Sequence, residues 1–300
     1  MPPPTIRVRS IGGDCILAVG HENVAPESLP RQRAWAPTRE DDLARHAAAS
    51  AAVRRRLSPR ADVAYGSTAE ETLDIFPAAT SGAPVMVFVH GGAWRRRMKE
   101  EIHFLATPFV EAGAMFVAVG FAVIPTVRLP GMVEQVGRAV AWVARHAANF
   151  GGDPDRIHLA GHSSGAHLTA VLLTEDWSRR FDVPNDVIKS GLCASGMYDL
   201  GPVLLSARSS YVMLSAEEIE ALSPERHVER VRCPVVVAYG EGESPEFQRQ
   251  ARDFAAALKA AGRPVELLRA DGVNHFEMLD LLGTNDGVLA RAAIDQMGLA

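Results

Sequence analysis

The sequence lacks the features of an exported, membrane-bound or nucleic-acid-binding protein. Its N-terminus has no apolar core of the kind found in signal peptides. The longest apolar stretch, residues 112–127, is interrupted by glycines and Pro125 and is too short to cross a bilayer. The formal net charge of -5 gives no basic excess for nucleic acid. We therefore expect a cytoplasmic protein with neither a nucleic-acid partner nor a membrane anchor.

Cysteine is also scarce, and the cysteines that occur match neither a metal site nor a disulfide framework. Cys15, Cys193 and Cys233 lie far apart in the chain. Cys193 and Cys233 fall within apolar, strand-like runs, where a buried free thiol is the usual outcome. This pattern indicates a reducing compartment.

Hydrophobic residues, by contrast, make up 47% of the 300 residues, which is enough for a sizeable core. From residue 60 onward, strand-like runs alternate with segments of helical periodicity. We expect strands at 71–78 (an edge strand), 84–90, 114–121, 156–162, 188–196, 234–240 and 264–272. We expect helices at 39–57, 132–150, 164–175, 215–224 and 245–262.

This alternation predicts an α/β fold with a mostly parallel central sheet and helices on both faces. The composition does not change along the chain, and no linker interrupts it. We therefore predict a single domain over residues 26–300. Residues 1–25 are predicted to be an N-terminal extension with a short strand at 5–9.

The segment GHSSGAHL, residues 161–168, lies between a predicted strand and a predicted helix and contains the pattern G-x-S-x-G. Gly161 and Gly165 lack the Cβ atoms that would clash in a sharp strand-to-helix turn. Such a turn projects the Ser163 hydroxyl outward and directs the helix N-terminus at a reaction centre. The context favours Ser163 as a nucleophile over an ordinary turn serine.

A second glycine motif, HGGAW at residues 90–94, follows an earlier predicted strand. We predict that Gly91, Gly92 or Ala93, together with Ser164, donate backbone N–H groups to a developing oxyanion. Donors of this kind are typically worth about 3 kcal/mol each. His90 is interpreted as a structural residue that braces the loop.

A serine nucleophile needs a base, and the base needs an orienting acid. His275 follows the last predicted strand in a loop, the expected position for the base. The other candidate histidines lie inside predicted elements or beside the nucleophile, where we expect them to point elsewhere: His103, His146, His158, His162 and His167.

Several acids could orient His275. Glu241, Glu243 and Glu246 follow the strand at 234–240, and Asp199 follows the strand at 188–196. Position alone does not separate Glu241 from Glu243. A nucleophile, an acid and a histidine in this order along the chain match the α/β-hydrolase order.

Six segments together resemble the α/β-hydrolase kynurenine formamidases (arylformamidases) and related carboxylesterases: HGGAW, MVEQVGRAVAWV, GHSSGAHL, SGMYDL, GESPEFQRQ and VNHFE. The resemblance runs from about Arg31 to Leu289. It implies Ser163 as the nucleophile, His275 as the base, the HGG loop as the oxyanion hole, and neither a metal nor a cofactor. In that family the acid directly precedes the SPEF segment, which selects Glu243, although a family member carries Asp there.

The resemblance implies hydrolysis of a small acyl group, of the formyl type, from an aromatic amide or ester. Trp94, Tyr198 and Phe276 flank the motifs and are predicted to line a pocket for the aromatic ring. One of the arginines from Arg95 to Arg97 could pair with a substrate carboxylate. Two alternatives remain: a short-chain carboxylesterase of broad specificity, and a non-catalytic small-molecule-binding protein on a hydrolase scaffold. A homodimer is compatible with the sequence.

Overall fold

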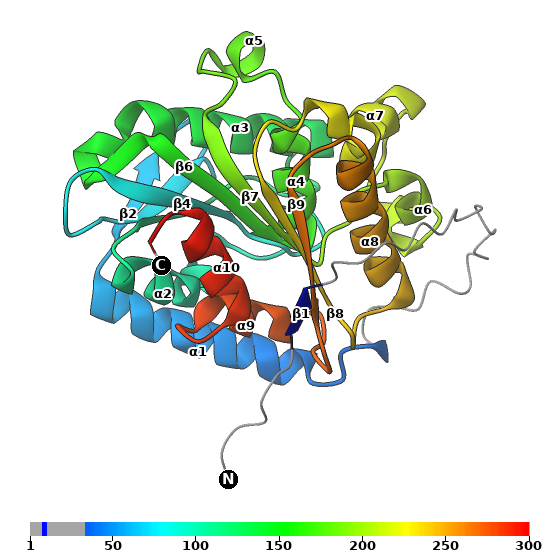
Figure 1. Cartoon of the computed structure of the whole chain (residues 1–300), viewed down its shortest axis with the longest axis horizontal. Coiled ribbons are helices and arrows are strands. Elements are labelled where there is room, and N and C mark those ends of the chain that lie inside the picture. The colour runs from blue at the N-terminus through cyan, green and yellow to red at the C-terminus, as the bar shows by residue number, and fades with distance from the viewer. Residues whose placement is uncertain (1–7, 11–33, 300) are drawn as a thin grey trace.

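A computed structural model describes residues 8–10 and 34–299 of the chain. Its strands form one sheet in the order β1-β9-β8-β7-β6-β4-β5-β3-β2 (Figure 1). The strands are β1 (Val8–Ser10), β2 (Arg60–Ala64), β3 (Thr72–Phe76), β4 (Ala83–Val89), β5 (Met115–Val119), β6 (Gly152–His162), β7 (Ile188–Ala194), β8 (Val235–Gly240) and β9 (Val265–Ala270).

The sheet is parallel from β5 through β4, β6, β7 and β8 to β9. The outer strands run the other way: β3 is antiparallel to β5, β2 to β3, and β1 to β9. The prediction of a mostly parallel α/β sheet is confirmed. Because the six parallel strands point in one direction, their carboxyl ends meet at one edge, where ligands bind in such sheets.

The prediction that residues 71–78 form an edge strand is wrong. β3 lies between β5 and β2, and four of its five residues are buried. The covering strand β2 was not predicted, because its short sequence RADVA offers no apolar run and its residues alternate between exposed and half-buried. This strand pairs with β3 and shields it from solvent.

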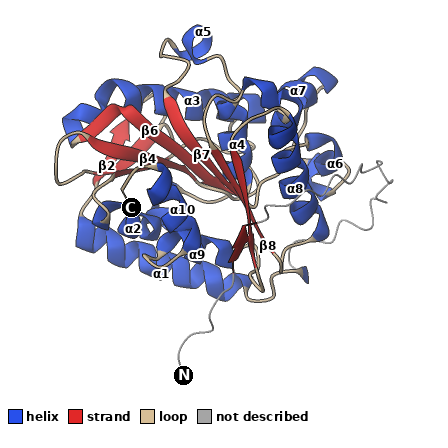
Figure 2. Ribbon diagram, in the orientation of Figure 1, coloured by secondary structure: helices blue, strands red, loops and turns tan. Residues whose placement is uncertain are grey.

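Helices cover both faces of the sheet (Figure 2). The α-helices are α1 (Arg39–Leu57), α2 (Ala106–Glu111), α3 (Leu129–His146), α4 (Ser164–Leu173), α5 (Trp177–Phe181), α6 (Leu200–Leu204), α7 (Ala216–Ala221), α8 (Pro245–Ala260), α9 (Asp280–Gly283) and α10 (Val288–Gln296). Short 3₁₀ helices are η3 (Lys99–Leu105), η4 (Ala147–Phe150), η5 (Ala207–Ser210), η6 (Pro224–Arg230) and η7 (Glu277–Leu279). The helices expected from the sequence are all present, and α7 carries the capping box between Ser215 and Glu218.

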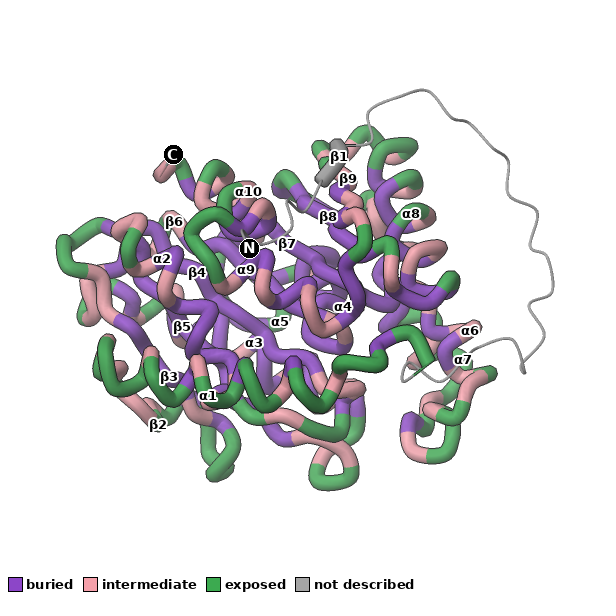
Figure 3. The backbone as a smooth tube through the Cα atoms, turned by 90° about the horizontal axis from the view of Figure 1, so that it is seen from below, coloured by how far each residue is buried: buried purple, intermediate pink, exposed green. Residues whose placement is uncertain are grey.

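The core has two halves, one on each face of the sheet. Val85, Val87 and Val89 of β4 point to the half that α3, α4 and α8 cover, whereas Met86 and Phe88 point to the half that α2, α9 and α10 cover. This alternation follows from the two-residue period of a strand. Buried residues accordingly concentrate in the strands (Figure 3).

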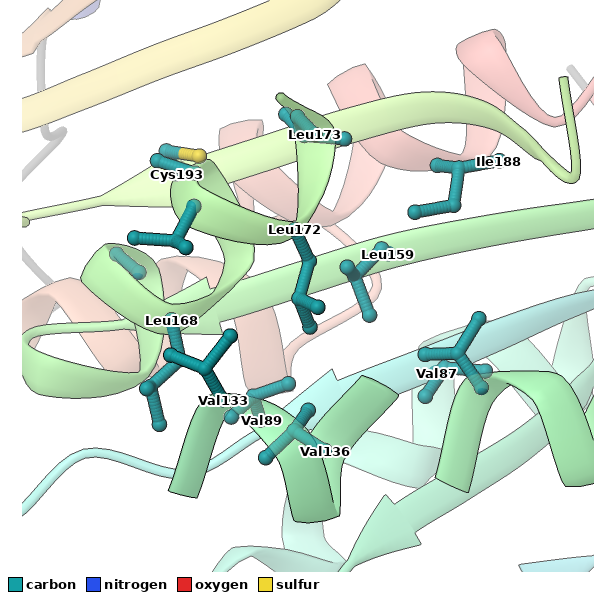
Figure 4. Packing of buried hydrophobic residues seen from close by; sticks show 14 of the residues in the cluster. Val87, Val89, Val133, Val136, Leu159, Leu168, Leu172, Leu173, Ile188 and Cys193 are labelled. Atoms are coloured by element: carbon teal, nitrogen blue, oxygen red, sulfur yellow. The ribbon is translucent and has the colours of Figure 1, made fainter. Parts of the chain in front are cut away.

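The helices α3 and α4 fix the position of the strand-to-helix turn that follows β6. Val133 and Val136 of α3 pack beside Leu168 and Leu172 of α4, above the valines of β4 (Figure 4). Every residue of α4 is buried. Since burial of an apolar side chain stabilises a fold by about 1.5–3 kcal/mol, α4 is held firmly at the centre of the molecule.

The predicted domain boundary at residue 25 and Cys15 lie outside the described residues. The strand predicted at 5–9 overlaps β1, which pairs with the end of β9. Cys193 and Cys233 are buried free thiols, as predicted. Among residues 8–10 and 34–299, no helix combines the length and the apolar character that a membrane span requires.

Candidate active site

Ser163 lies in a tight turn between β6 and α4. Its backbone has φ 58° and ψ -123°, a left-handed conformation that costs energy for a residue with a side chain. A Cβ atom on Gly165 would lie 2.1 Å from the carbonyl oxygen of Val89, and one on Gly161 would lie 2.4 Å from the carbonyl oxygen of Gly165. Only glycine at these two positions lets the turn close against β4.

The Ser163 hydroxyl is the first member of a hydrogen-bonded chain. Its Oγ lies 2.9 Å from Nε2 of His275, and Nδ1 of His275 lies 2.5 Å from Oε1 of Glu243. The second oxygen of Glu243 accepts from the Ser195 hydroxyl at 3.1 Å and from the Gly240 N–H at 2.9 Å. With the Nδ1 proton donated to Glu243, Nε2 is free to accept the serine proton.

The structure distinguishes the acids that sequence position left open. Glu243 is fully buried and reaches His275. Glu241 instead accepts from the backbone N–H of Gly272 at 3.0 Å, on the exposed side of the turn. Glu246 and Asp199 each pair with an arginine side chain. Of the four candidates, Glu243 is the one that contacts the histidine.

Burial controls the protonation of this pair. It lowers the pKa of His275 to about 3, and the positive charges of Arg208 and Arg97 act in the same direction. Burial acts to raise the pKa of Glu243, while the hydrogen bonds from Gly240 and Ser195 oppose that rise. The imidazole is therefore neutral near neutral pH, which is the form that can accept a proton from a hydroxyl.

The loop after β4 presents backbone donors beside Ser163. Gly92, Ala93 and Trp94 all have positive φ angles, of 120°, 56° and 57°. Within the described residues, no acceptor is found for the backbone N–H groups of Gly92, Ala93 or Ser164. Gly92 and Ala93 face the same cavity as Ser163. These three N–H groups are suited to a negatively charged oxygen.

Gly91 and the Ser164 side chain join the loop after β4 to the serine turn. Gly91 is buried, and a Cβ atom there would lie 2.7 Å from the carbonyl oxygen of His162, so the loop approaches the serine turn closely. The Ser164 hydroxyl accepts the backbone N–H of Trp94 at 3.2 Å and so joins the loop to α4. His90 stacks on Phe121 at the base of the loop, with ring centroids 4.3 Å apart.

The two histidines that flank Ser163 have separate structural partners. His162 Nε2 donates to the carbonyl oxygen of His275 at 2.8 Å, which fixes the backbone of the loop that carries His275. His167 Nε2 donates to the Leu222 carbonyl oxygen at 2.8 Å, and its Nδ1 accepts from the indole N–H of Trp94 at 3.3 Å. Both are fixed by hydrogen bonds, and neither bonds the Ser163 hydroxyl.

A cavity of about 420 Å³ opens over Ser163 and His275. Phe276 lines it, as predicted, but Trp94 and Tyr198 do not, so the prediction for those two residues is wrong. The left-handed backbone of Trp94 directs its ring into the core against His167. Tyr198 stacks on Phe254 in the core, with ring centroids 4.2 Å apart.

Sequence reasoning missed several residues of this cavity. Arg39 and Leu43 come from α1, and Arg208 and Tyr211 come from the segment around η5. No motif marks these positions, because they reach the cavity only through the tertiary fold. In the part of the chain that the structure describes, no group of three or more His, Cys, Asp or Glu side chains is arranged to hold a metal ion.

Comparisons with known proteins identify the family of this chain. The chain is 33% identical over 244 residues to the kynurenine formamidase of Danio rerio, covering 79% of this chain and 81% of that protein. The kynurenine formamidase of Salmo salar is 34% identical over 245 residues, with the same coverage. The chain belongs to the kynurenine formamidase family of α/β-hydrolases. It is therefore a hydrolase.

Esterases are also similar to this hydrolase. Residues 73–191 match the family model BD-FAE. Esterase LipQ of Mycobacterium tuberculosis is 31% identical over 268 residues, covering 82% of this chain and 63% of that protein. The solved structure of a protein from Silicibacter sp. TM1040, proposed to be a thioesterase, has a TM-score of 0.78 at 26% identity and covers 87% of this chain and 96% of its own. The carboxylesterase EstE1 shares the fold, with a TM-score of 0.70 at 20% identity and coverage of 92% and 98%.

Proposed function

We propose that this hydrolase removes a small acyl group, of the formyl type, from an aromatic amide or ester, with Ser163 as nucleophile, His275 as base and Glu243 as the orienting acid. The observation that carries the proposal is the hydrogen-bonded chain from Ser163 Oγ to His275 Nε2 at 2.9 Å and from His275 Nδ1 to Glu243 at 2.5 Å. The Ser163 end of this hydrogen-bonded chain lies in the cavity, beside the backbone N–H groups of Gly92 and Ala93, which have no acceptor among the described residues.

In the first half of the reaction, Nε2 of His275 takes the hydroxyl proton as Ser163 Oγ attacks the acyl carbon. The carbonyl oxygen becomes negatively charged and accepts hydrogen bonds from the N–H groups of Gly92, Ala93 and Ser164. Donors that are already oriented cost no reorganisation at this point. Glu243 holds the Nδ1 proton and stabilises the imidazolium that forms.

The first half-reaction ends when the tetrahedral intermediate collapses and the bond to the leaving group breaks. His275 gives its Nε2 proton to the departing amine or alcohol, and the acyl group remains on Ser163. A water molecule then loses a proton to His275 and attacks the acyl carbon. His275 returns this proton to Ser163 Oγ as the acyl–serine bond breaks, which releases the carboxylic acid and restores the Ser163 hydroxyl. One histidine thus serves both half-reactions.

The acyl amide of an aromatic amine is favoured as the substrate because proteins named kynurenine formamidase are similar over about four-fifths of the chain. Phe276, which lines the cavity, offers an aromatic surface for such a ring. A short-chain carboxylesterase is the second candidate, favoured by the similarity to esterase LipQ. The buried free thiols of Cys193 and Cys233 are consistent with the cytoplasmic location we propose.

The test compares N-formylkynurenine with p-nitrophenyl acetate, each with wild type and Ser163→Ala. We expect turnover of both by wild type and a loss of about 10⁴-fold or more in the variant. Cleavage of the ester with no detectable cleavage of the formamide would replace the formamidase by the carboxylesterase. Folded wild-type protein that cleaves neither substrate and is not labelled by a fluorophosphonate would instead be a binding protein.

A further inference from the structure

The proposed oxyanion hole takes its donors from two separate elements. Gly92 and Ala93 belong to the loop after β4, whereas the N–H group of Ser164 lies at the start of α4. Donors of this kind stabilise a developing charge only when they already point at the same place before the reaction begins. The hole therefore needs a connection that fixes the loop relative to α4.

The backbone of this loop is strained and needs support from its surroundings. Gly92, Ala93 and Trp94 follow one another with positive φ angles of 120°, 56° and 57°. For Ala93 and Trp94, which carry side chains, this conformation is unfavourable and persists only where the surrounding structure enforces it. The contacts of Trp94, the last of the three residues, provide that support.

Trp94 is held through its backbone and through its side chain. Its N–H donates to the Ser164 hydroxyl at 3.2 Å, and its carbonyl oxygen accepts from the N–H of Ile124 at 2.9 Å. Its indole Nε1 donates to Nδ1 of His167 at 3.3 Å. Ser164 and His167 are three residues apart on α4, so one face of this helix holds both the backbone and the ring of Trp94.

The second partner of His167 decides that its ring accepts the indole bond. Nε2 lies 2.8 Å from the carbonyl oxygen of Leu222, which can only accept, so Nε2 carries the proton and Nδ1 does not. The ring is fully buried, and burial lowers the pKa of His167 to about 4, which keeps the ring neutral near neutral pH. A protonated ring would turn a donor toward the indole N–H of Trp94, which is itself a donor. The neutral tautomer of His167 is therefore the form that holds Trp94.

We propose that His167 is a positioning residue for the oxyanion hole, because it fixes the loop donors relative to α4 through the indole of Trp94. This inference rests on the proposed function, since it concerns the same oxyanion hole. Neither Trp94 nor His167 is among the described residues that line the cavity, so both act through the loop. Loss of the bond between them should lower kcat and leave KM near the wild-type value, because the hole binds a charge that develops only in the transition state.

The first test removes the indole donor. Trp94→Phe keeps an aromatic ring in the core but has no N–H group for His167. We expect kcat for p-nitrophenyl acetate and for N-formylkynurenine to fall by about 10–100-fold, as for a small displacement of preorganised donors, with KM near wild type. Trp177→Phe is the matched control and should keep the wild-type kcat. Trp177 is 2% exposed, as Trp94 is, and its indole donates to the Leu172 carbonyl oxygen at 3.0 Å, at the far end of α4.

The second test separates positioning from packing at His167. In His167→Asn the side-chain oxygen is attached to Cγ, as Nδ1 is, and can accept from Trp94. In His167→Gln the amide lies one bond further out, as Nε2 does, and can donate to Leu222 but does not replace the acceptor for Trp94. Glutamine is the better helix former, so stability in urea should favour His167→Gln. We expect the opposite order for kcat, with His167→Asn faster by about tenfold, as for one hydrogen bond. In the Trp94→Phe background this difference should disappear.

The outcomes separate this inference from the proposed function. Wild type that cleaves the ester but not the formamide would reject the formamidase, and kcat of the variants for the ester would still decide the positioning role. An unchanged kcat in Trp94→Phe, with wild type active, would overturn the positioning role alone. A kcat that follows stability, higher in His167→Gln than in His167→Asn, would make His167 a packing residue. Folded wild type that cleaves neither substrate and is not labelled by a fluorophosphonate would overturn both.

Discussion

Two fully buried carboxylates each hydrogen-bond a histidine, but only one of the two has a cation beside it. Asp74 of β3 accepts from His103 at 2.8 Å and from Lys99 at 2.9 Å. Glu243, after β8, bonds His275 at 2.5 Å and otherwise has neutral donors. Burial raises the pKa of both acids. For Asp74 the histidine, a backbone N–H and Lys99 outweigh burial and bring its pKa to about 2, whereas the pKa of Glu243 remains raised by burial.

The difference separates a structural pair from a reactive one. Lys99 also binds Asp62 at 2.7 Å and Glu100 at 2.8 Å, so the charges around Asp74 are compensated and fix the start of η3. The pair of Glu243 and His275 has no such compensation. An imidazolium that forms there during the reaction finds an acid without a competing cation, which suits a pair that must change its protonation.

The largest effect is expected on catalysis, when the acid of the reactive pair is changed. Glu243→Gln keeps the shape of the side chain but removes the charge that orients and stabilises His275. We expect kcat to fall by about 10⁴-fold, as for the corresponding change in other serine hydrolases. Steady-state kinetics on p-nitrophenyl acetate measures the loss, and circular dichroism checks the fold.

Glu241→Gln is the matched control for Glu243→Gln. Glu241 lies two residues away and bonds the backbone of Gly272, so its substitution should leave kcat near the wild-type value. A large loss in Glu241→Gln together with near-normal activity in Glu243→Gln would reassign the acid.

The second effect is on stability. Asp74→Ala leaves Lys99 buried without its innermost partner, and breaking a buried pair in this way typically costs about 3–5 kcal/mol. Urea unfolding measures the change in the free energy of unfolding. Glu243→Gln, which leaves no cation unpaired, should cost clearly less. Equal losses in the two variants would show that the cation beside Asp74 does not distinguish the pairs.

The lowered pKa of Asp74 predicts how the stability of the fold depends on pH. The pKa of Asp74 is lowered from 3.8 to about 2, so its contribution is present above pH 3.8 and is lost as the pH falls through about 2. A shift of this size corresponds to about 2 kcal/mol. Asp74→Ala should therefore unfold with a shallower dependence on acid than wild type. A variant with the same acid dependence as wild type would contradict the low pKa.

The sequence predicts the reactive pair better than the structural one, and the reason is physical. Ser163 and His275 follow strands, and the sharp turn at Ser163 requires Gly161 and Gly165, so local sequence marks the place. The choice of Glu243 over Glu241 depends on which side of one turn faces the histidine, and residues two apart look alike in sequence. A resemblance to a family, and not the spacing, made that choice.

The arginines that α1 and η5 contribute to the cavity could not be predicted in this way. Arg208 reaches the cavity through the packing of a short 3₁₀ segment with no periodic pattern. Trp94 shows the opposite failure: it adjoins a motif, but its positive φ directs its side chain into the core. β2 was missed because RADVA has no apolar run, and its pairing with β3 decides that Asp74 is buried. Tertiary packing decides these positions, and local patterns do not report it.

A smaller effect is expected when a neutral donor to Glu243 is removed. Ser195→Ala deletes the hydroxyl that donates to Oε2 at 3.1 Å and leaves the other donors in place. Loss of one hydrogen bond to a buried carboxylate corresponds to about a tenfold decrease in kcat. Ser190→Ala on β7, which removes a buried bond to His158 at 2.7 Å, is the control and should not change kcat. Equal effects of the two variants would indicate a general disturbance of β7.

The smallest effect concerns the charge that acts on His275 from across the cavity. The positive charge of Arg208 lowers the pKa of His275, so Arg208→Gln should raise that pKa. The base must be neutral to act, and its activity is lost as the pH falls through its pKa. The acidic limb of kcat/KM for neutral p-nitrophenyl acetate should therefore move to higher pH in Arg208→Gln, while Arg55→Gln leaves it in place. A shift to lower pH would contradict this electrostatic effect, because removing a cation raises the pKa of either member of the pair.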